Sequence, residues 1–289
     1  RSPSRGLGDV YKRQVISSAR NHALQSSAHL ASVCGVTLRQ TGSTGRSCLL
    51  TSRGTLEVRS CDVTSACGLC VEVTDGAAPL IRNCRVHEGL AAGLWFRAGG
   101  SGLVEGCEIA RNGWSGVQIS EGAHPSLLHN SIHDNKSAGI ISFNGGRGLA
   151  CRNEIWSNGK GGVQVRSGAF PVLLRNTIRD ERSFGIWVYE NGLGRFERNE
   201  IIDNAWSGLQ VEEGSMPTVT ANRLCGNRSA GIVVYNRGSG EAAKHGRRRS
   251  ARVRATCELT AAPCACAGVY EWNDISNNGR CGVQIKSGR

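Results

Sequence analysis

A pattern of 23 residues repeats along most of this chain and constrains its fold more than any other feature. In steps of 23 residues, one column reads Cys61, Cys84, Cys107, Asn130, Asn153, Asn176, Asn199 and Asn222. A second column reads Gly93, Gly116, Gly139, Gly162, Gly185, Gly208 and Gly231. Neither column slips by a residue, and a period held this strictly indicates one structural unit stacked many times.

Each unit contains short strands separated by turns. Apolar residues lie two apart after each repeated glycine, as in Val117 and Ile119, and this alternation is typical of strands. Gly, Asn, Asp and Ser separate the strands, and these residues favour turns. One unit cannot bury its apolar side alone, but units stacked ~4.8 Å apart can. The sequence therefore predicts an all-β fold, a single-stranded right-handed parallel β-helix (solenoid) of about nine to ten coils.

Alternate coils differ at one position, where proline and glycine take turns. In 23-residue steps the column reads Pro79, Gly102, Pro125, Gly148, Pro171, Gly194, Pro217 and Gly240. The deeper period is therefore 46 residues, and we expect the 23-residue coils to form 46-residue double repeats.

The start of the chain lies outside the strict register. Residues 1–14 match nothing in the repeat and are interpreted as a non-native leader. Residues 15–54 are predicted to form an N-terminal cap and a first irregular coil. Within them, residues 15–33 are expected to form a short helix that covers the open end of the solenoid. The regular β-helix is predicted over residues 55–289.

One insertion breaks the register near the end. Residues 241–268 delay the next repeat by 28 residues, carry six basic and two acidic residues, and lack strand alternation. They are predicted to form an exposed loop. Codons for Gly240-Glu241 and Ala267-Gly268 can match splice signals, so a retained intron is the favoured origin. A nuclear-localisation or nucleic-acid loop is the alternative. The last residues follow a strand without a cap, from which we expect a fragment of a longer protein.

The asparagine column is predicted to be structural. A stacked Asn can bond a turn backbone and the Asn of the next coil, as in cross-β ladders. The cysteines of the first three coils are expected to fill the same pocket. The predicted ladder consists of Asn130, Asn153, Asn176, Asn199, Asn222 and Asn273.

The outward positions of the strand after each repeated glycine are rich in aromatic residues. Five of the chain's 15 aromatic residues fall there, and exposed aromatic surface often marks a partner site. Rings that merely cover one another are the alternative. The predicted partner-binding residues are Trp95, Phe143, Trp187, Tyr189 and Tyr235.

A second outward column is basic and reads His129, Arg152, Arg175 and Arg198. Four such groups about 5 Å apart repel one another unless something neutralises them. The neighbouring column supplies Glu154 and Glu200, so a salt-bridged surface lattice is favoured over an anion or partner patch.

Composition bounds the possible partners. Of the formal charge of +12, residues 1–14 and 241–268 carry +3 and +4, which leaves a mildly basic body and no expected nucleic-acid partner. No apolar run spans a bilayer and no signal segment opens the chain, so the expectations are no membrane partner and a cytoplasmic or nuclear location. The 13 cysteines include one CxxC, Cys67 to Cys70, without a second pair or paired His. No metal or cofactor is therefore expected.

Many parallel β-helices act on polysaccharides, but the sequence offers few catalytic groups for this. Hydrolysis needs two converging carboxylates, whereas the outward columns hold Glu72 and Glu212, six coils apart. Asp134, Asp180 and Asp203 fall at predicted turns, where Asp is ordinary. A non-catalytic protein is therefore favoured.

Particular repeats resemble a known family. The run Gly139–Gly148 (GIISFNGGRG), Gly185–Tyr189 (GIWVY) and the alternating blocks SGAFPVLLRNTI and NGLGRFERNEI are similar to repeats of the F-box only β-helix proteins, members ten and eleven. The resemblance covers about residues 55–289. It implies a substrate-recognition subunit of an SCF-type ubiquitin ligase, whose β-helix binds the protein to be ubiquitinated. Binding to the ligase core would require an F-box, which is not visible before residue 55.

The sequence thus predicts a non-catalytic protein-recognition solenoid that binds a protein substrate in a ubiquitin-ligase pathway. A carbohydrate-active lyase, hydrolase or epimerase is the alternative, and a purely structural repeat protein is the third possibility.

Overall fold

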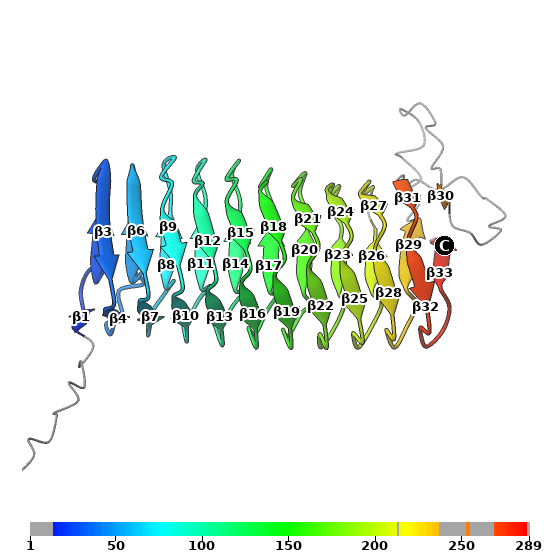
Figure 1. Ribbon diagram of the computed structural model, residues 1–289, viewed down its shortest axis with the longest axis horizontal. Helices are drawn as coiled ribbons and strands as arrows, with labels where there is room; N and C mark the ends of the chain where they lie inside the picture. The colour runs from blue at the N-terminus through cyan, green and yellow to red at the C-terminus, as the bar shows by residue number, and fades with distance from the viewer. Residues whose placement is uncertain (1–13, 213, 237–252, 255–268, 288–289) are drawn as a thin grey trace, which may run out of the picture.

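Three parallel β-sheets run the length of the molecule and enclose one narrow core (Figure 1). The computed structural model describes residues 14–212, 214–236, 253–254 and 269–287. Within these residues each sheet has 11 strands, every pairing is parallel, and each strand pairs with its counterpart in the next coil. The parallel β-helix predicted from the repeats is confirmed. The described residues contain no helix, and so none that could cross a membrane.

Sheet A consists of β1 (Val15–Ser18), β4 (Thr37–Gln40), β7 (Asp62–Ser65), β10 (Arg85–His87), β13 (Glu108–Ala110), β16 (Ser131–His133), β19 (Glu154–Trp156), β22 (Thr177–Arg179), β25 (Glu200–Ile202), β28 (Arg223–Cys225) and β32 (Asp274–Ser276). Sheet B consists of β2 (Leu24–Ser26), β5 (Leu49–Thr51), β8 (Val71–Val73), β11 (Leu94–Phe96), β14 (Val117–Ile119), β17 (Ile140–Ser142), β20 (Val163–Val165), β23 (Ile186–Val188), β26 (Leu209–Val211), β29 (Ile232–Asn236) and β33 (Val283–Ser287). Sheet C consists of β3 (Leu30–Cys34), β6 (Thr55–Arg59), β9 (Leu80–Arg82), β12 (Leu103–Glu105), β15 (Ser126–Leu128), β18 (Leu149–Cys151), β21 (Val172–Leu174), β24 (Arg195–Glu197), β27 (Thr218–Thr220), β31 (Val269–Glu271) and β30 (Val253–Arg254).

The helix expected over residues 15–33 is wrong. Those residues form β1, β2 and β3, which pair in parallel with β4, β5 and β6 and extend all three sheets. Their turns differ in length from 23 residues, so the column method did not detect them. The expected leader falls on residues 1–14, of which all but Gln14 lie outside the described residues. The insertion at 241–268 is described only at β30, and the register resumes where Val269 pairs with Thr218.

The repeated glycines and prolines have steric reasons. A Cβ on Gly185 would lie 2.4 Å from Cγ2 of Ile201 and 2.6 Å from the carbonyl oxygen of Gly208, so the corner has no room for a side chain. At Gly148 the backbone has φ +117° and a Cβ would lie 2.6 Å from the carbonyl oxygen of Pro125. The 46-residue period therefore records a corner in which proline and left-handed glycine pack on each other.

The predicted asparagine column forms a continuous hydrogen-bonded ladder at the corner between sheets C and A. Asn153 donates from its backbone N and from Nδ2 to Oδ1 of Asn176, both at 2.9 Å. Its Nδ2 also donates to the carbonyl oxygen of Leu127 at 2.9 Å. In the first coils a thiol replaces the amide, and the backbone N of Cys84 donates to Sγ of Cys107 at 3.4 Å.

A second buried ladder, which the sequence columns did not reveal, lies at the corner between sheets A and B. Its members are Asn112, Asn135, Asn158, Glu181, Asn204, Asn227 and Asn278. Glu181 is 1% exposed and accepts from the backbone N and Nδ2 of Asn158 at 2.7 and 3.0 Å. A carboxylate has no NH₂ group, so it cannot donate onward as its neighbours do. Burial raises the pKa of Glu181 from 4.5 to about 8, and an uncharged carboxylic acid fits this site.

The ladder at the corner between sheets C and A makes a testable prediction. Asn176→Ala should lower the free energy of unfolding by roughly 2–4 kcal/mol, because it leaves two donors of Asn153 without an acceptor. Asn176→Cys should cost less, since a thiol already accepts in the ladder at Cys107. Urea unfolding of both variants checks this order, and equal losses would show that side-chain volume matters more than the accepted hydrogen bonds.

Candidate functional site

The outer face of sheet B is a band of aromatic, amide and charged side chains. In this sheet the first and third residues of each strand point into the core, as Leu94 and Phe96 do, and the second points outward. The residue after the strand also lies on the outer surface. All five predicted partner-binding aromatics lie in these two columns, which we call the floor. The floor runs along the whole sheet because strands pair without slipping, for example Trp187 beside Gln164 and Gln210.

The floor aromatics are half-buried and fixed by polar neighbours. Trp187 stacks on Tyr189 with ring centroids 4.1 Å apart, and its Nε1 donates to Oε1 of Glu212 at 2.7 Å. Trp95 donates to Oγ of Ser120 at 3.0 Å. The remaining two predicted aromatics each meet a cation, Phe143 under Arg166 and Tyr235 under Lys286. These rings form no continuous apolar patch and resemble separate stacking platforms with polar edges.

The loop between sheets A and B stands beside this floor and is rich in basic groups. Its exposed basic side chains, which we call the wall, are Lys136, Lys160, Arg182, Arg228 and Arg280. Among the described residues no carboxylate forms an ion pair with any of the five. Trp114 and Trp206 project from the same loop and are 55% and 54% exposed. Phe184 packs against both Trp206 and Trp187, so wall and floor form one surface.

Wall and floor meet in a cavity of about 400 Å³ near the C-terminal end of the described solenoid. Its charged lining is entirely basic, from Arg228, Arg280 and Lys286. Its other lining groups are aromatic, small or polar, namely Phe184, Ala205, Trp206, Ser207, Gln210, Ser229, Val233 and Tyr235. A cavity with three cations, three aromatic rings and no carboxylate suits an anionic ligand that also presents flat apolar faces.

Tyr235 and Lys286 form the one close pair of titratable groups inside this cavity among the described residues. They occupy paired positions of β29 and β33, and Nζ of Lys286 donates to the Tyr235 oxygen at 3.0 Å. An ammonium group at this distance stabilises negative charge on the phenol oxygen. The pair can therefore accept a proton from a ligand held beside it.

A second cavity of about 310 Å³ lies at the N-terminal end of the same floor. There Nδ1 of His22 bonds the carbonyl oxygen of Ser47 at 2.7 Å, and Oγ of Ser47 donates to Glu72 at 3.1 Å. Arg97 clasps the other Glu72 oxygen at 3.0 and 2.7 Å. Two arginines are matched by two acids in this lining, so it lacks the positive excess of the first cavity.

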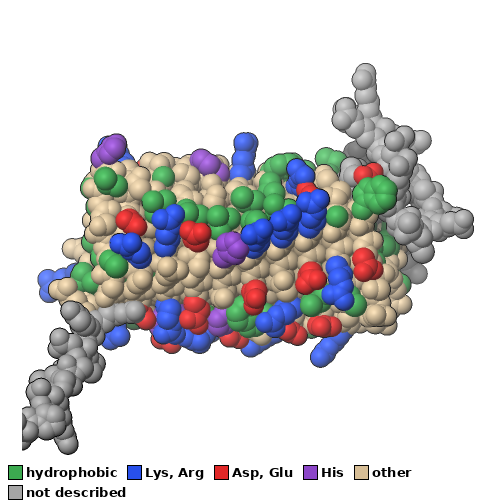
Figure 2. All heavy atoms as spheres, viewed as in Figure 1, with side chains coloured by type: hydrophobic (Ala, Val, Ile, Leu, Met, Phe, Trp, Pro, Cys, Tyr) green, Lys and Arg blue, Asp and Glu red, His purple; other side chains and the backbone are tan. Residues whose placement is uncertain are grey.

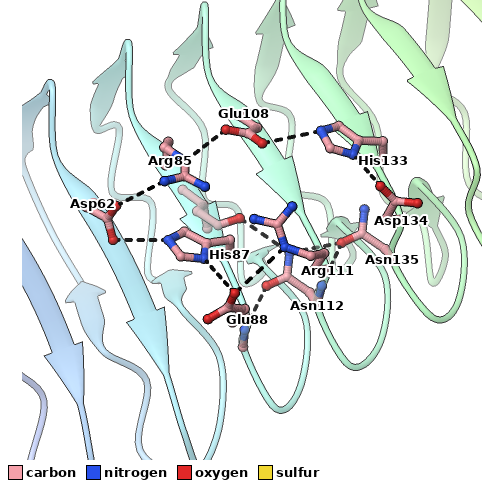
Figure 3. Close-up of polar contacts among 12 residues, drawn as sticks. Asp62, Arg85, His87, Glu88, Glu108, Arg111, Asn112, His133, Asp134 and Asn135 are labelled. Atoms are coloured by element: carbon pink, nitrogen blue, oxygen red, sulfur yellow. Dashed lines mark hydrogen bonds and ion pairs between the residues drawn. The ribbon is translucent and has the colours of Figure 1, made fainter.

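The densest cluster of acids and imidazoles lies elsewhere, on the outer face of sheet A (Figure 3). His87 stands between Asp62 at 3.1 Å and Glu88 at 3.6 Å. His133 stands between Glu108 at 3.5 Å and Asp134 at 2.8 Å. Both nitrogens of each ring already face a carboxylate. This cluster is therefore a surface ion-pair lattice with no imidazole nitrogen left for a substrate.

The predicted basic column lies at the corner between sheets C and A, away from both cavities. Figure 2 shows Lys and Arg side chains in a row along this face. The salt-bridged lattice predicted for the column is wrong for most of it: Glu154 pairs with Arg179 and Glu200 with Arg223. Only Arg198, through Glu197, has an ion pair among the described residues of the column, which consists of His129, Arg152, Arg175 and Arg198. The corner needs a left-handed residue, with φ between 53° and 55°, and exposes its side chain.

Sequence reasoning found the floor aromatics but missed the wall and the two cavities. The wall lies in a loop whose residues alternate between coils with a 46-residue period, as Lys136, Arg182 and Arg228 do. Stepping by 46 residues in the loop would have found it. His22 and Ser47 precede the strict register, so no column pointed to them.

Comparisons with known proteins place the fold. Residues 23–170 and 144–244 match the model of the family described as "Right handed beta helix region". The periplasmic alginate epimerase AlgG is similar in structure, with a TM-score of 0.57 at 14% identity over 88% of this chain and 73% of that chain. A point mutant of AlgG gives 0.63 at 16% identity, over 88% and 72%. The A-module of the Azotobacter vinelandii mannuronan C-5 epimerase AlgE4 gives 0.50 at 12% identity, over 90% and 88%. No curated protein sequence matches.

These findings correct the functional prediction from sequence. The matching family model is that of right-handed β-helices in general, and nothing in the comparisons supports membership of the F-box only proteins. The similar solved structures are polysaccharide epimerases, so the expectation of a non-catalytic ubiquitin-ligase adaptor is wrong. The resemblance rested on the Asn, Gly and Pro positions, which serve the coil itself and are shared by β-helices of different function.

Proposed function

The chain belongs to the right-handed β-helix family, and we propose that it is an enzyme that binds an anionic, uronate-containing polysaccharide along the outer face of sheet B. The observation that carries this proposal is the cavity in which Arg228, Arg280 and Lys286 surround Tyr235 without a carboxylate. The neighbours named as alginate epimerases support the same class of substrate. They share this architecture at low identity, so the case rests on the side chains of this chain.

Floor and wall each match one property of such a polymer. Aromatic rings such as Trp187 and Trp95 offer flat faces on which the C–H face of a sugar can stack. Guanidinium groups such as Arg182 and Arg228 bind carboxylates through charge-assisted hydrogen bonds. Because the wall cations have no protein carboxylate as an ion-pair partner among the described residues, a polyanion would not have to displace one.

The carboxylate geometry disfavours hydrolysis. Paired carboxylates in glycosidases stand roughly 5–10 Å apart. On the described floor the carboxylates are Glu72 and Glu212, six coils or about 29 Å apart. Glu72 is held by Arg97, and Glu212 accepts from Trp187 and Gln210. Chemistry that needs one base beside a cationic clamp is therefore favoured over chemistry that needs two acids.

Removal of the proton at C5 of a uronate is such chemistry. Arg228 and Arg280 would hold the uronate carboxylate and stabilise the charge that develops on it as the adjacent C–H bond breaks. The phenolate of Tyr235, stabilised by Lys286, would take the proton. Return of a proton to the opposite face gives the C5 epimer, and loss of the C4 substituent gives an unsaturated product. Both reactions share this first step.

The proposal is tested with purified protein and a panel of polymers. We expect binding of polyuronates and none of a neutral glucan. In D₂O we expect deuterium at C5 by NMR in epimerisation, or a rise in ultraviolet absorbance from an unsaturated product in elimination.

A matched set of variants locates the activity. Arg228→Gln and Arg280→Gln should each lower polyuronate turnover by about 10²-fold or more. Arg198→Gln, an exposed arginine at the remote corner between sheets C and A, should leave it unchanged. Turnover of a neutral glucan instead, or no change of any panel polymer and no binding, would contradict the proposed function.

A further inference from the structure

The side chains that face the proposed polymer alternate with the parity of the coil. One class of coil carries aromatic residues on the floor, and its residues are Trp95, Phe143, the pair Trp187 and Tyr189, and Tyr235. The intervening class carries amides at the equivalent outward position, and its residues are Gln118, Gln164, Gln210 and Gln284. Strand pairing places these classes in strict succession, with Trp95 beside Gln118 and Trp187 between Gln164 and Gln210.

The wall alternates with the same period and the opposite sense. Coils with an aromatic floor carry Lys136, Arg182 and Arg228 in the wall loop. Coils with an amide floor carry Trp114, Lys160, Trp206 and Arg280 at the neighbouring loop position. At the best-described junction Trp206 of an amide coil packs edge-on to Phe184 at 4.7 Å, and Phe184 packs on Trp187 of the aromatic coil at 5.3 Å. The repeating unit of the binding surface is thus two coils long, about 10 Å.

From this alternation we infer that the ligand is a ribbon-shaped polyuronate that repeats every two sugar residues and is bound in register with the two-coil units. This inference rests on the proposed function and deepens it. In an extended chain with a two-residue repeat, successive sugars turn opposite faces to one side. One sugar of each pair would stack on a floor aromatic such as Trp187 beside a wall cation such as Arg182. The next would hydrogen-bond to an amide such as Gln210 and meet Trp206.

Two local contacts fit this assignment. The Gln164 amide donates through Nε2 to the carbonyl oxygen of Lys160 at 2.9 Å, which ties the floor of an amide coil to its own wall. The Tyr189 hydroxyl donates to Oε1 of Gln164 at 3.4 Å, which links neighbouring coils of opposite class. The floor side chains are thereby held in place before a ligand arrives, and each two-coil unit forms a preorganised subsite pair.

The experiment measures affinity for polyuronate oligosaccharides of increasing length, from two to about eight residues, by calorimetry. The expected result is a staircase, in which affinity rises roughly tenfold with each added disaccharide and little with each single residue between. A smooth rise with every residue would overturn the inference and leave the proposed function standing. No binding of any length, or equal binding of neutral oligosaccharides, would instead sink the proposed function.

A composition-matched variant tests the register directly. Trp187→Gln combined with Gln210→Trp keeps the same side chains but reverses their order on two adjacent coils. The staircase should be lost in this variant while a long polyuronate still binds. Trp95→Gln combined with Gln118→Trp makes the same exchange at the other end and serves if the first variant unfolds in a thermal melt. A staircase that persists in a folded exchange variant would overturn the inference.

Discussion

Tyr235→Phe is expected to lower turnover of a polyuronate by about 10²–10⁴-fold while leaving its binding within a few-fold of the native value. The substitution removes one oxygen, the acceptor for Nζ of Lys286 in the basic cavity. The ring remains, so stacking of a sugar is preserved, whereas the group proposed to take the C5 proton is gone. Single-turnover kinetics and a separate binding measurement distinguish these two effects.

Tyr189→Phe is the matched control for this prediction. Tyr189 lies in the same floor column two coils away, and its hydroxyl donates to Gln164 rather than meeting a cation. Its loss should change turnover by only a few-fold. Full activity of Tyr235→Phe, or an equal loss in both variants, would show that the base is a different group.

Glu181→Gln is expected to stabilise the folded protein strongly at alkaline pH. The carboxyl is buried in the ladder between sheets A and B, and burial raises its pKa to about 8. Gln has nearly the same shape, carries no charge, and supplies the NH₂ donor that every other member of this ladder has. Because one pKa unit corresponds to 1.36 kcal/mol, the expected gain above about pH 8 is on the order of 3–5 kcal/mol.

The sign follows from proton binding by the two states. Below the ordinary pKa of 4.5 both folded and unfolded chains hold the Glu181 proton. Between 4.5 and about 8 the unfolded chain releases it and the folded chain keeps it, so stability falls as pH rises through this window. Above it both states are ionised and this contribution is constant. The native protein should thus lose stability toward alkaline pH, and Glu181→Gln should lose less.

Urea midpoints of both proteins, measured from about pH 5 to about pH 9, check this expectation. Glu197→Gln, a partly exposed carboxyl on sheet C paired with Arg198, is the control and should keep the native pH profile. Parallel curves for the native protein and Glu181→Gln would show that the buried carboxyl is ionised throughout.

The strict columns made the solenoid predictable, because each column corresponds to one steric or hydrogen-bonding requirement. A repeated glycine such as Gly185 has no room for a Cβ, and a repeated Asn such as Asn153 bonds its counterparts above and below. Such requirements recur in every coil and are visible in a single sequence. The first three strands escaped this method because their turns vary, although they extend the same sheets.

The candidate site was less predictable because it depends on distances that no column records. Tyr235 was identified as an outward aromatic, but its partner Lys286 follows the insertion and lies 51 residues further on. The free wall cations were likewise invisible, since only the structure shows that Glu154 and Glu200 are engaged by Arg179 and Arg223. Function was therefore assigned from family-like scaffold residues, which carry no information about the ligand.

The two-coil unit makes the molecule a ruler. Each coil bonds only to its neighbours, so one more 46-residue block would add about 10 Å of surface without disturbing the coils already present. The length of polymer held, and with it the minimum size of substrate, would then be set by how many blocks a gene encodes. Relatives with longer or shorter solenoids should differ in the oligosaccharide length at which their affinity reaches its plateau, and should keep the same preference for charge.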